Sequence, residues 1–126
     1  MEVRLKKILV ADDEKSLRML ISGTLEIGNF LVSEADNGQD AWKMVSEEKP
    51  DLVILDVMMP GMTGYQVCQL IKSNQELQKI KVIILTAKGQ QADKEAALEA
   101  RADYYIAKPF SPAQLLSVVE DILGEQ

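Results

Sequence analysis

Histidine is absent from the 126-residue sequence, and cysteine occurs once, as Cys68. The lack of histidine excludes His-based catalytic triads, His-ligated zinc sites and HExxH metalloproteases. A single cysteine cannot form an internal disulfide, which is compatible with a reducing compartment. Any chemistry must therefore come from carboxylates, hydroxyls, lysine or arginine.

Positive charge and long apolar runs are also scarce. The 14 Lys and Arg residues are outnumbered by 20 Asp and Glu residues, which gives a net charge of −6. Such a domain would be repelled by a phosphate backbone, so we expect no direct nucleic-acid binding by it. The first apolar run, at 8–11, is too short for a signal peptide or a membrane span. We therefore expect a cytoplasmic protein without a membrane segment.

Short apolar runs alternate with helical patterns along the whole chain. The runs at 52–55 and 82–85 are apolar at every position, which predicts strands buried on both faces. Three more strands are predicted at 8–11, 30–35 and 104–107. Each is followed by a helical pattern, with N-caps expected at Asn37, Thr63 and Ser111. The length suits one domain over residues 1–126, with its core at about 6–123.

Five strand–helix units in strict alternation predict an α/β fold. Its parallel sheet would carry helices on both faces, joined by right-handed crossovers. The helical pattern at about 90–100 contains few large apolar residues. We expect that helix to be the most loosely held.

A polar side chain follows four of the five predicted strands. These are Asp12 and Asp13, Asp56, Thr86 and Lys108. Parallel strands end at the same edge of a sheet, where open α/β sheets bind ligands. Each residue also has a structural interpretation, as a helix cap, a strand end, a strand residue or a solvated charge. Their joint occurrence at one edge favours a functional site.

Electrostatics indicates what this site would bind. Two carboxylates about 5 Å apart repel by roughly 3 kcal/mol at an effective dielectric near 20. A cluster of three persists more readily beside a cation, and an all-oxygen site suits Mg²⁺ or Mn²⁺. A carboxylate next to a divalent cation, a lysine and a hydroxyl meets the requirements for phosphoryl transfer to aspartate.

At these residues the sequence resembles a response-regulator receiver domain, over about residues 6–123. The resemblance implies a flavodoxin-like, doubly wound (βα)5 fold with a five-stranded parallel sheet in the order 2-1-3-4-5. It also implies a two-component signalling domain rather than an enzyme, one that assists its own phosphorylation and slow autodephosphorylation. The matching motifs are Asp12-Asp13, Leu55-Asp56-Val57-Met58-Met59-Pro60-Gly61, Thr86-Ala87 and Lys108-Pro109-Phe110.

The resemblance assigns the phosphoacceptor and the metal ligands. Asp56 would accept the phosphoryl group from a phosphohistidine or a small acyl phosphate, and Lys108 would pair with that group. Asp13 and Asp56, with the backbone carbonyl of Met58, would bind Mg²⁺ directly, or Mn²⁺ in its place. Asp12 would assist through a water molecule.

The resemblance also implies a conformational switch and partners. Thr86 would move to hydrogen-bond the phosphoryl group, and Tyr105, rather than its neighbour Tyr104, would turn inward. Lys108-Pro109 would be a cis peptide. The partners would be a sensor histidine kinase or phosphotransfer protein, and an output domain or effector that the sequence does not identify. They would act through the face formed by the fourth helix, fifth strand and fifth helix.

Two features concern the lifetime of the phosphoryl group and dimerisation. Met58 and Lys88, each two residues after a site residue, offer no obvious group to position water, so we expect a fairly long-lived phosphoryl group. The last helix carries Glu120 and Asp121 but neither lysine nor arginine. The charge-paired dimer of subfamilies with winged-helix DNA-binding outputs is therefore not expected, whereas another phosphorylation-dependent homodimer stays open.

Three other protein classes share part of this pattern. A haloacid-dehalogenase-like phosphatase needs a second Asp as general acid two residues after its nucleophile, and Met58 occupies that place. A flavodoxin-type FMN binder needs a phosphate loop after the first strand, where Asp12 and Asp13 would repel the phosphate. A pseudo-receiver that only binds partners remains the alternative, disfavoured because all five polar groups are retained.

Overall fold

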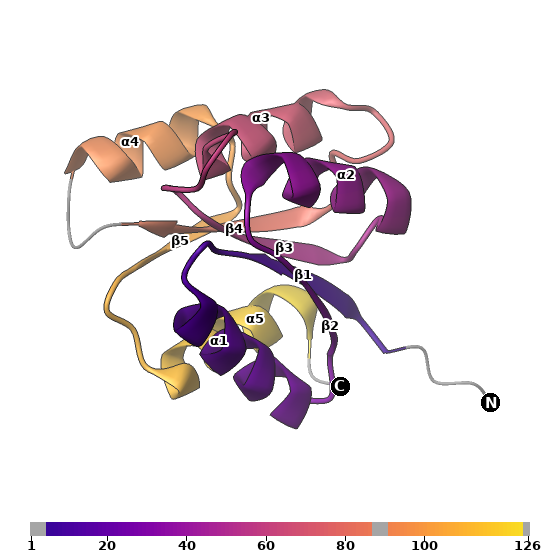
Figure 1. Ribbon diagram of the computed structural model, residues 1–126, viewed down its shortest axis with the longest axis vertical. Coiled ribbons are helices and arrows are strands. Elements are labelled where there is room, and N and C mark those ends of the chain that lie inside the picture. The colour runs from indigo at the N-terminus through magenta and orange to yellow at the C-terminus, as the bar shows by residue number, and fades with distance from the viewer. Residues whose placement is uncertain (1–4, 87–90, 125–126) are drawn as a thin grey trace.

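The computed structural model contains one sheet of five parallel strands, in the order β2-β1-β3-β4-β5 (Figure 1). It describes residues 5–86 and 91–124, without the side chains of residues 91–94. The α/β class and the strand order expected from the sequence and its resemblance are confirmed. The strands are β1 Lys7–Ala11, β2 Leu31–Ala35, β3 Leu52–Asp56, β4 Lys81–Thr86 and β5 Tyr104–Ala107.

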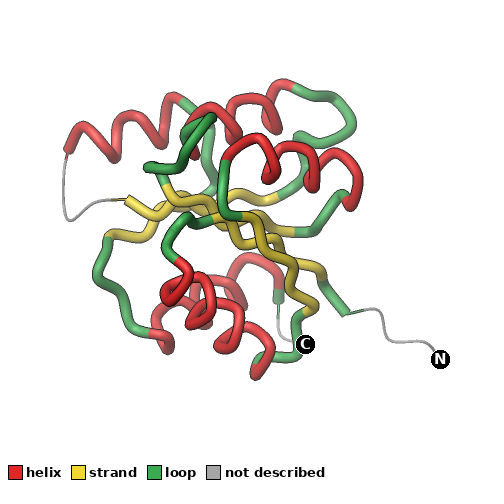
Figure 2. Tube along the Cα trace, in the orientation of Figure 1, coloured by secondary structure: helices red, strands yellow, loops and turns green. Residues whose placement is uncertain are grey.

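Helices cover both faces of the sheet, so the molecule has three layers. In Figures 1 and 2, α2, α3 and α4 lie on one side of the strands and α1 and α5 on the other. Within the described residues, no helix is long and apolar enough to cross a membrane. The helices are α1 Lys15–Ile27, α2 Gly38–Glu48, α3 Gly64–Ser73, α4 Gln91–Glu99 and α5 Pro112–Leu123.

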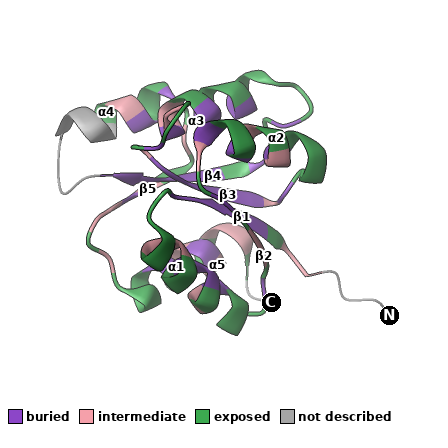
Figure 3. Ribbon diagram, in the orientation of Figure 1, coloured by how far each residue is buried: buried purple, intermediate pink, exposed green. Residues whose placement is uncertain are grey.

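The inner runs of the central strands, at 8–11, 52–55 and 82–85, are apolar at every position because each contributes side chains to two cores. Along β3, Leu52 and Ile54 face the core shared with α1 and α5, whereas Val53 and Leu55 face the core shared with α2 and α3. The same alternation runs through β1 and β4. Figure 3 shows these buried strands between two helical layers with exposed outer faces. The apolar runs that predicted buried strands are thus buried on both faces, and β3 lies in the middle of the sheet.

Three helices begin at the residues that the sequence predicted. The side chains of Asn37, Thr63 and Ser111 each accept a hydrogen bond from the backbone N–H three residues on. One strand begins later than expected, at Leu31 and not at Phe30. The Phe30 N–H donates to the carbonyl of Leu25, so Phe30 completes the end of α1 instead of joining the sheet ladder.

The fourth helix has the thin apolar face that its sequence predicted. Among its described side chains Ala97 is buried, whereas Leu98 is 68% exposed. A face of this kind buries little apolar area. The looser attachment of α4 stays a prediction.

Candidate functional site

Three carboxylates meet at the edge of the sheet where the parallel strands end. Asp12 follows β1 directly, Asp13 comes next, and Asp56 is the last residue of β3. Strand register fixes this meeting, since Ala11 on β1 pairs with Leu55 on β3. Carboxylate oxygens of the three residues lie within 4.8 Å of one another. The acidic cluster predicted from the sequence is therefore present in space.

Asp56 is held by the backbone that surrounds it. It is nearly buried, and it pairs with Leu85 in the middle of the sheet. The first residue of α3, Gly64, lies against it, so closely that a Cβ atom at Gly64 would clash with the Asp56 carbonyl oxygen. Only glycine lets the helix approach so closely. The start of α3 therefore packs directly on the end of β3, and the loop between them stays close to Asp56.

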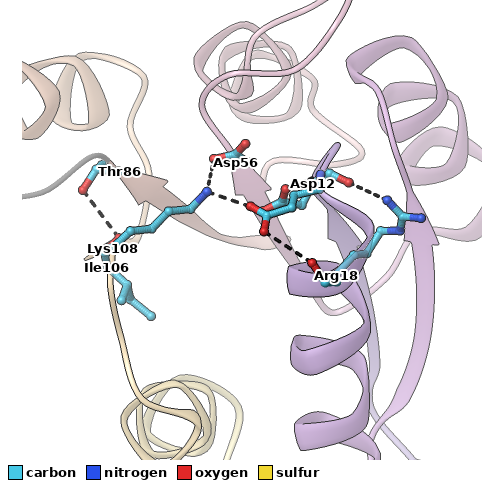
Figure 4. Close-up of polar contacts among 8 residues, drawn as sticks. Asp12, Arg18, Asp56, Thr86, Ile106 and Lys108 are labelled. Carbon is cyan, nitrogen blue, oxygen red and sulfur yellow. Dashed lines mark hydrogen bonds and ion pairs between the residues drawn. The ribbon is translucent and has the colours of Figure 1, made fainter.

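Lys108 reaches this cluster from the end of β5, as Figure 4 shows. Its Nζ lies 2.8 Å from Asp56 Oδ1 and 3.6 Å from Asp12 Oδ2. Its backbone N–H donates to the Thr86 carbonyl at 2.9 Å, which fixes the lysine beside β4. The Lys108-Pro109 peptide is cis, as the resemblance implied.

Asp12 is the most deeply buried of the three carboxylates. Its Oδ1 accepts a hydrogen bond from the Glu14 N–H at 2.9 Å. Its Oδ2 accepts none from the described part of the chain. Burial raises the pKa of Asp12, and the charge of Asp56 raises it further. Neither Asp12 nor Asp13 is the N-cap of α1, because that position is Glu14.

Lys108 stays charged in this setting. Burial lowers the pKa of Lys108, but its hydrogen bond to Asp56 and the charges of Asp56 and Asp12 outweigh burial and raise the pKa above its usual value. One ammonium then faces three carboxylates. The excess negative charge, the all-oxygen donors and an Asp12 Oδ2 that accepts no hydrogen bond from the described residues fit a divalent cation. Asp13 is exposed, so this side of the cluster is open to solvent.

Thr86 shares the sheet edge without contacting the carboxylates. Its hydroxyl makes a long, 3.5 Å hydrogen bond to the carbonyl of Ile106 on β5 (Figure 4). As the last residue of β4, Thr86 lies at the same sheet edge as the other four polar groups, but its hydroxyl does not hydrogen-bond to the carboxylates in the described part of the chain. Tyr105 is half-buried against the α3 and α4 side, whereas Tyr104 is 48% exposed. Ala87 and Lys88 lie outside the described residues.

Sequence reasoning missed an arginine that contacts this site. The Arg18 guanidinium donates to the Asp12 carbonyl and to the Glu34 carboxylate, both at 2.8 Å. Arg18 looked like an ordinary polar residue of a helix, and no sequence pattern links it to Glu34. The contact arises because α1 and β2 meet at the end of β1. A sheet order is needed before that meeting can be anticipated.

Comparison with known proteins decides the family. The model of the response regulator receiver domain matches residues 8–120 of this chain. The chain belongs to the response-regulator receiver family. Receiver domains are signalling domains of two-component systems, and they work with histidine kinases and output domains.

Two solved receiver structures resemble this receiver closely. The chemotaxis response regulator CheY4 of Vibrio cholerae matches with a TM-score of 0.89 and 28% identity, over 95% of this chain and 100% of that one. The receiver domain of sensor histidine kinase PA1611 from Pseudomonas aeruginosa matches with a TM-score of 0.88 and 25% identity, over 97% and 100%. That domain holds a magnesium ion in its active-site cleft.

The curated relatives are longer proteins. The phosphate regulon transcriptional regulatory protein PhoB of Pseudomonas aeruginosa is 40% identical over 118 residues, which are 94% of this receiver and 52% of PhoB. The receiver thus spans about half the length of the curated relatives that it matches. The functions of their remaining halves are not assigned to this receiver.

Proposed function

We propose that Asp56 accepts a phosphoryl group from the phosphohistidine of a separate kinase or phosphotransfer protein, or from a small acyl phosphate. The observation that carries this proposal is the position of its carboxylate, between the Lys108 ammonium and two further aspartates. An Asp56 oxygen forms the new O–P bond. The P–N bond to the donor imidazole, or the P–O bond to the acyl group, breaks with its electron pair leaving on the donor.

The chain's own residues prepare this transfer. The Lys108 hydrogen bond orients the Asp56 carboxylate and leaves a positive charge beside the incoming phosphoryl oxygens. Asp13, Asp56 and the Met58 carbonyl would hold Mg²⁺ directly and Asp12 would hold it through water, with Mn²⁺ able to substitute. When bound, the ion neutralises charge on the phosphoryl oxygens.

Thr86 and Tyr105 form the proposed switch. Within the described residues, the Thr86 hydroxyl would give up only a long hydrogen bond to the Ile106 carbonyl. It would turn to the phosphoryl group, and Tyr105 would move inward into the space that Thr86 leaves. This changes the surface formed by α4, β5 and α5 that partners contact. A phosphoryl group can shift the equilibrium between two conformations only if it interacts with them differently. On Asp56 it would accept a hydrogen bond from Thr86 in one conformation and not in the other.

The lifetime of the phosphoryl group depends on its loss to water. The Met58 side chain is 74% exposed and apolar, so it cannot position an attacking water by hydrogen bonding. Autodephosphorylation is therefore slow in this proposal. The second expected determinant, Lys88, lies outside the described residues.

The proposal also covers the extent of the domain, its location in the cell and its partners. Residues 1–126 form one receiver domain with its core at 6–123, in a cytoplasmic protein that has a histidine kinase or phosphotransfer donor and an output domain or effector. This domain does not bind nucleic acid itself. A phosphorylation-dependent homodimer would not use basic residues of α5, because this helix has none.

Acetyl phosphate with Mg²⁺ tests the central claim. Intact mass should show one added phosphoryl group on the wild type and none on Asp56→Asn. Equal labelling of both proteins would remove Asp56 as the acceptor. An unlabelled wild type would favour the pseudo-receiver, and continuous release of phosphate without accumulation would favour a phosphatase.

A further inference from the structure

Arg18 joins the acidic loop after β1 to the end of β2. The side chain leaves the first half of α1, and its Nη1 donates to the backbone carbonyl of Asp12 at 2.8 Å. Its Nε donates to Glu34 Oε1, also at 2.8 Å. A planar guanidinium with two fixed donors can hold two acceptors in one geometry. Figure 4 shows it on the side of Asp12 away from Lys108.

The position of the Asp12 carbonyl determines the position of the Asp13 backbone. The paired positions of β1 end at Ala11, and the Asp12 N–H still donates to the Ala35 carbonyl at 3.1 Å. The Asp12 carbonyl lies just past the paired strands, where the guanidinium takes the place of a strand partner. Because the peptide unit is planar, fixing this carbonyl also fixes the N–H and Cα of Asp13. Asp13 itself is exposed, so neighbouring packing does little to aim its carboxylate.

Glu34 aims the arginine in turn. A cleft of about 510 Å³ between α1, β2 and α2 lies beside Arg18 and Glu34, and none of the three site aspartates lines it. The Arg18 side chain lines this cleft but is only 15% exposed, and its two hydrogen bonds fix the direction of the guanidinium. The sequence of contacts runs from Glu34 through Arg18 to the Asp12-Asp13 peptide.

We propose that Arg18 is a positioning residue for divalent-cation binding, acting through the Asp12 carbonyl to set the direction of Asp13. The proposal rests on the proposed function of the acidic cluster. The direction of the change in Mg²⁺ affinity on removing Arg18 distinguishes positioning from a simple charge effect. Removing a positive charge near a cation site should tighten cation binding, whereas losing the positioning of a ligand should weaken it.

Calorimetric titration of the unphosphorylated protein with Mg²⁺ measures this sign. Arg18→Met should raise the Mg²⁺ dissociation constant about tenfold, in the range seen when partners of metal ligands are removed. Arg18→Lys keeps the charge but not the fork, and should give an intermediate value. The matched control is Lys15→Met, which removes a charge from an exposed residue of the same helix turn. It should bind Mg²⁺ as the wild type does or slightly more tightly.

Phosphorylation supplies the second readout. In Arg18→Met the Mg²⁺ concentration for half-maximal labelling by acetyl phosphate should rise about tenfold, with a smaller effect on the rate at saturating Mg²⁺. Unchanged or tighter Mg²⁺ binding by Arg18→Met overturns the inference, as does equal weakening by Lys15→Met. If thermal melting in EDTA shows that Arg18→Met does not fold, Arg18→Lys decides by the same criteria. A wild type that binds no Mg²⁺ would instead refute the proposed function.

Discussion

Two lysine–aspartate pairs lie at opposite ends of the same sheet. At the end where the strands finish, Lys108 Nζ is 2.8 Å from Asp56 Oδ1. At the end where β5 begins, Lys72 Nζ on α3 is 2.7 Å from Asp103 Oδ2. Both pairs are mostly buried and of similar length. Their surroundings differ, and that difference separates a structural role from a functional one.

The Lys72 pair is balanced. Its ammonium also donates to the carbonyls of Ile80 at 2.8 Å and Gln78 at 3.2 Å. Asp103 accepts in addition from the Val82 N–H at 2.8 Å. The Asp103 carboxylate also lies 4.0 Å from the exposed Lys81 ammonium, so no excess negative charge remains here. Hydrogen bonds use the three donors of Lys72. These contacts join α3, β4 and the start of β5, which is sufficient reason for the pair to exist.

The Lys108 pair is not balanced. One ammonium lies beside a cluster of three carboxylates and contacts two of them. Asp12 Oδ2 is buried without a hydrogen bond in the described part of the chain. Folding alone would not favour that excess of negative charge. Strained electrostatics in a solvent-accessible site is typical of functional centres. Imbalance therefore marks this end of the sheet as the site.

Breaking the balanced pair should have the largest effect on stability. Lys72→Met should lower the free energy of unfolding by about 3 kcal/mol, because the partly buried Asp103 loses its nearer ammonium and the carbonyls of Ile80 and Gln78 lose a donor. Urea denaturation measures the loss, and Mg²⁺ should not restore it. The exposed Lys79 provides the matched control, and Lys79→Met should stay within about 0.5 kcal/mol of the wild type. A loss that Mg²⁺ reverses would contradict the separation of the two pairs.

The stability lost on breaking the unbalanced pair should be restored by a divalent cation. Lys108→Met should destabilise the protein in EDTA, since three carboxylates lose their counter-charge, and Mg²⁺ should then stabilise it more than it stabilises the wild type. At 100 times the dissociation constant, linkage gives about 2.7 kcal/mol, and tighter binding adds to this value. Thermal melts with and without Mg²⁺ measure the effect. Asp13→Ala should abolish it, and a response equal to that of the wild type would argue against replacement of the ammonium by a cation.

The sequence predicted one end of the sheet better than the other. Asp12, Asp56 and Lys108 were found because each follows a buried strand, and parallel strands end together. Lys72 and Asp103 were missed because one lies on a helix and the other in a loop, and no local pattern joins them. Arg18 and Glu34 escaped for the same reason. The direction of the Thr86 hydroxyl was also beyond sequence reasoning, since it depends on a rotamer chosen by the neighbouring strand.

The smallest effect concerns a titratable group beside the balanced pair. Cys68 is buried, its Sγ lies 3.3 Å from the Ala100 carbonyl, and burial raises its pKa to about 12. The thiol is therefore protonated and inaccessible at pH 8, so iodoacetamide should not label the native protein and should label it fully in urea. Its neutral form is favoured in the folded state, so this group reduces stability only as the pH rises above about 9, the usual thiol value.

A Gln75→Cys variant supplies the accessible control for this labelling, because position 75 is exposed. It should take up one label when native and two in urea. Labelling of native Cys68 at a rate close to that of the new cysteine would show that the region around Lys72 opens readily. The contrast between a rigid, balanced end and a cation-responsive end of the sheet would then fail. Both ends would respond to solutes, one to iodoacetamide and the other to Mg²⁺.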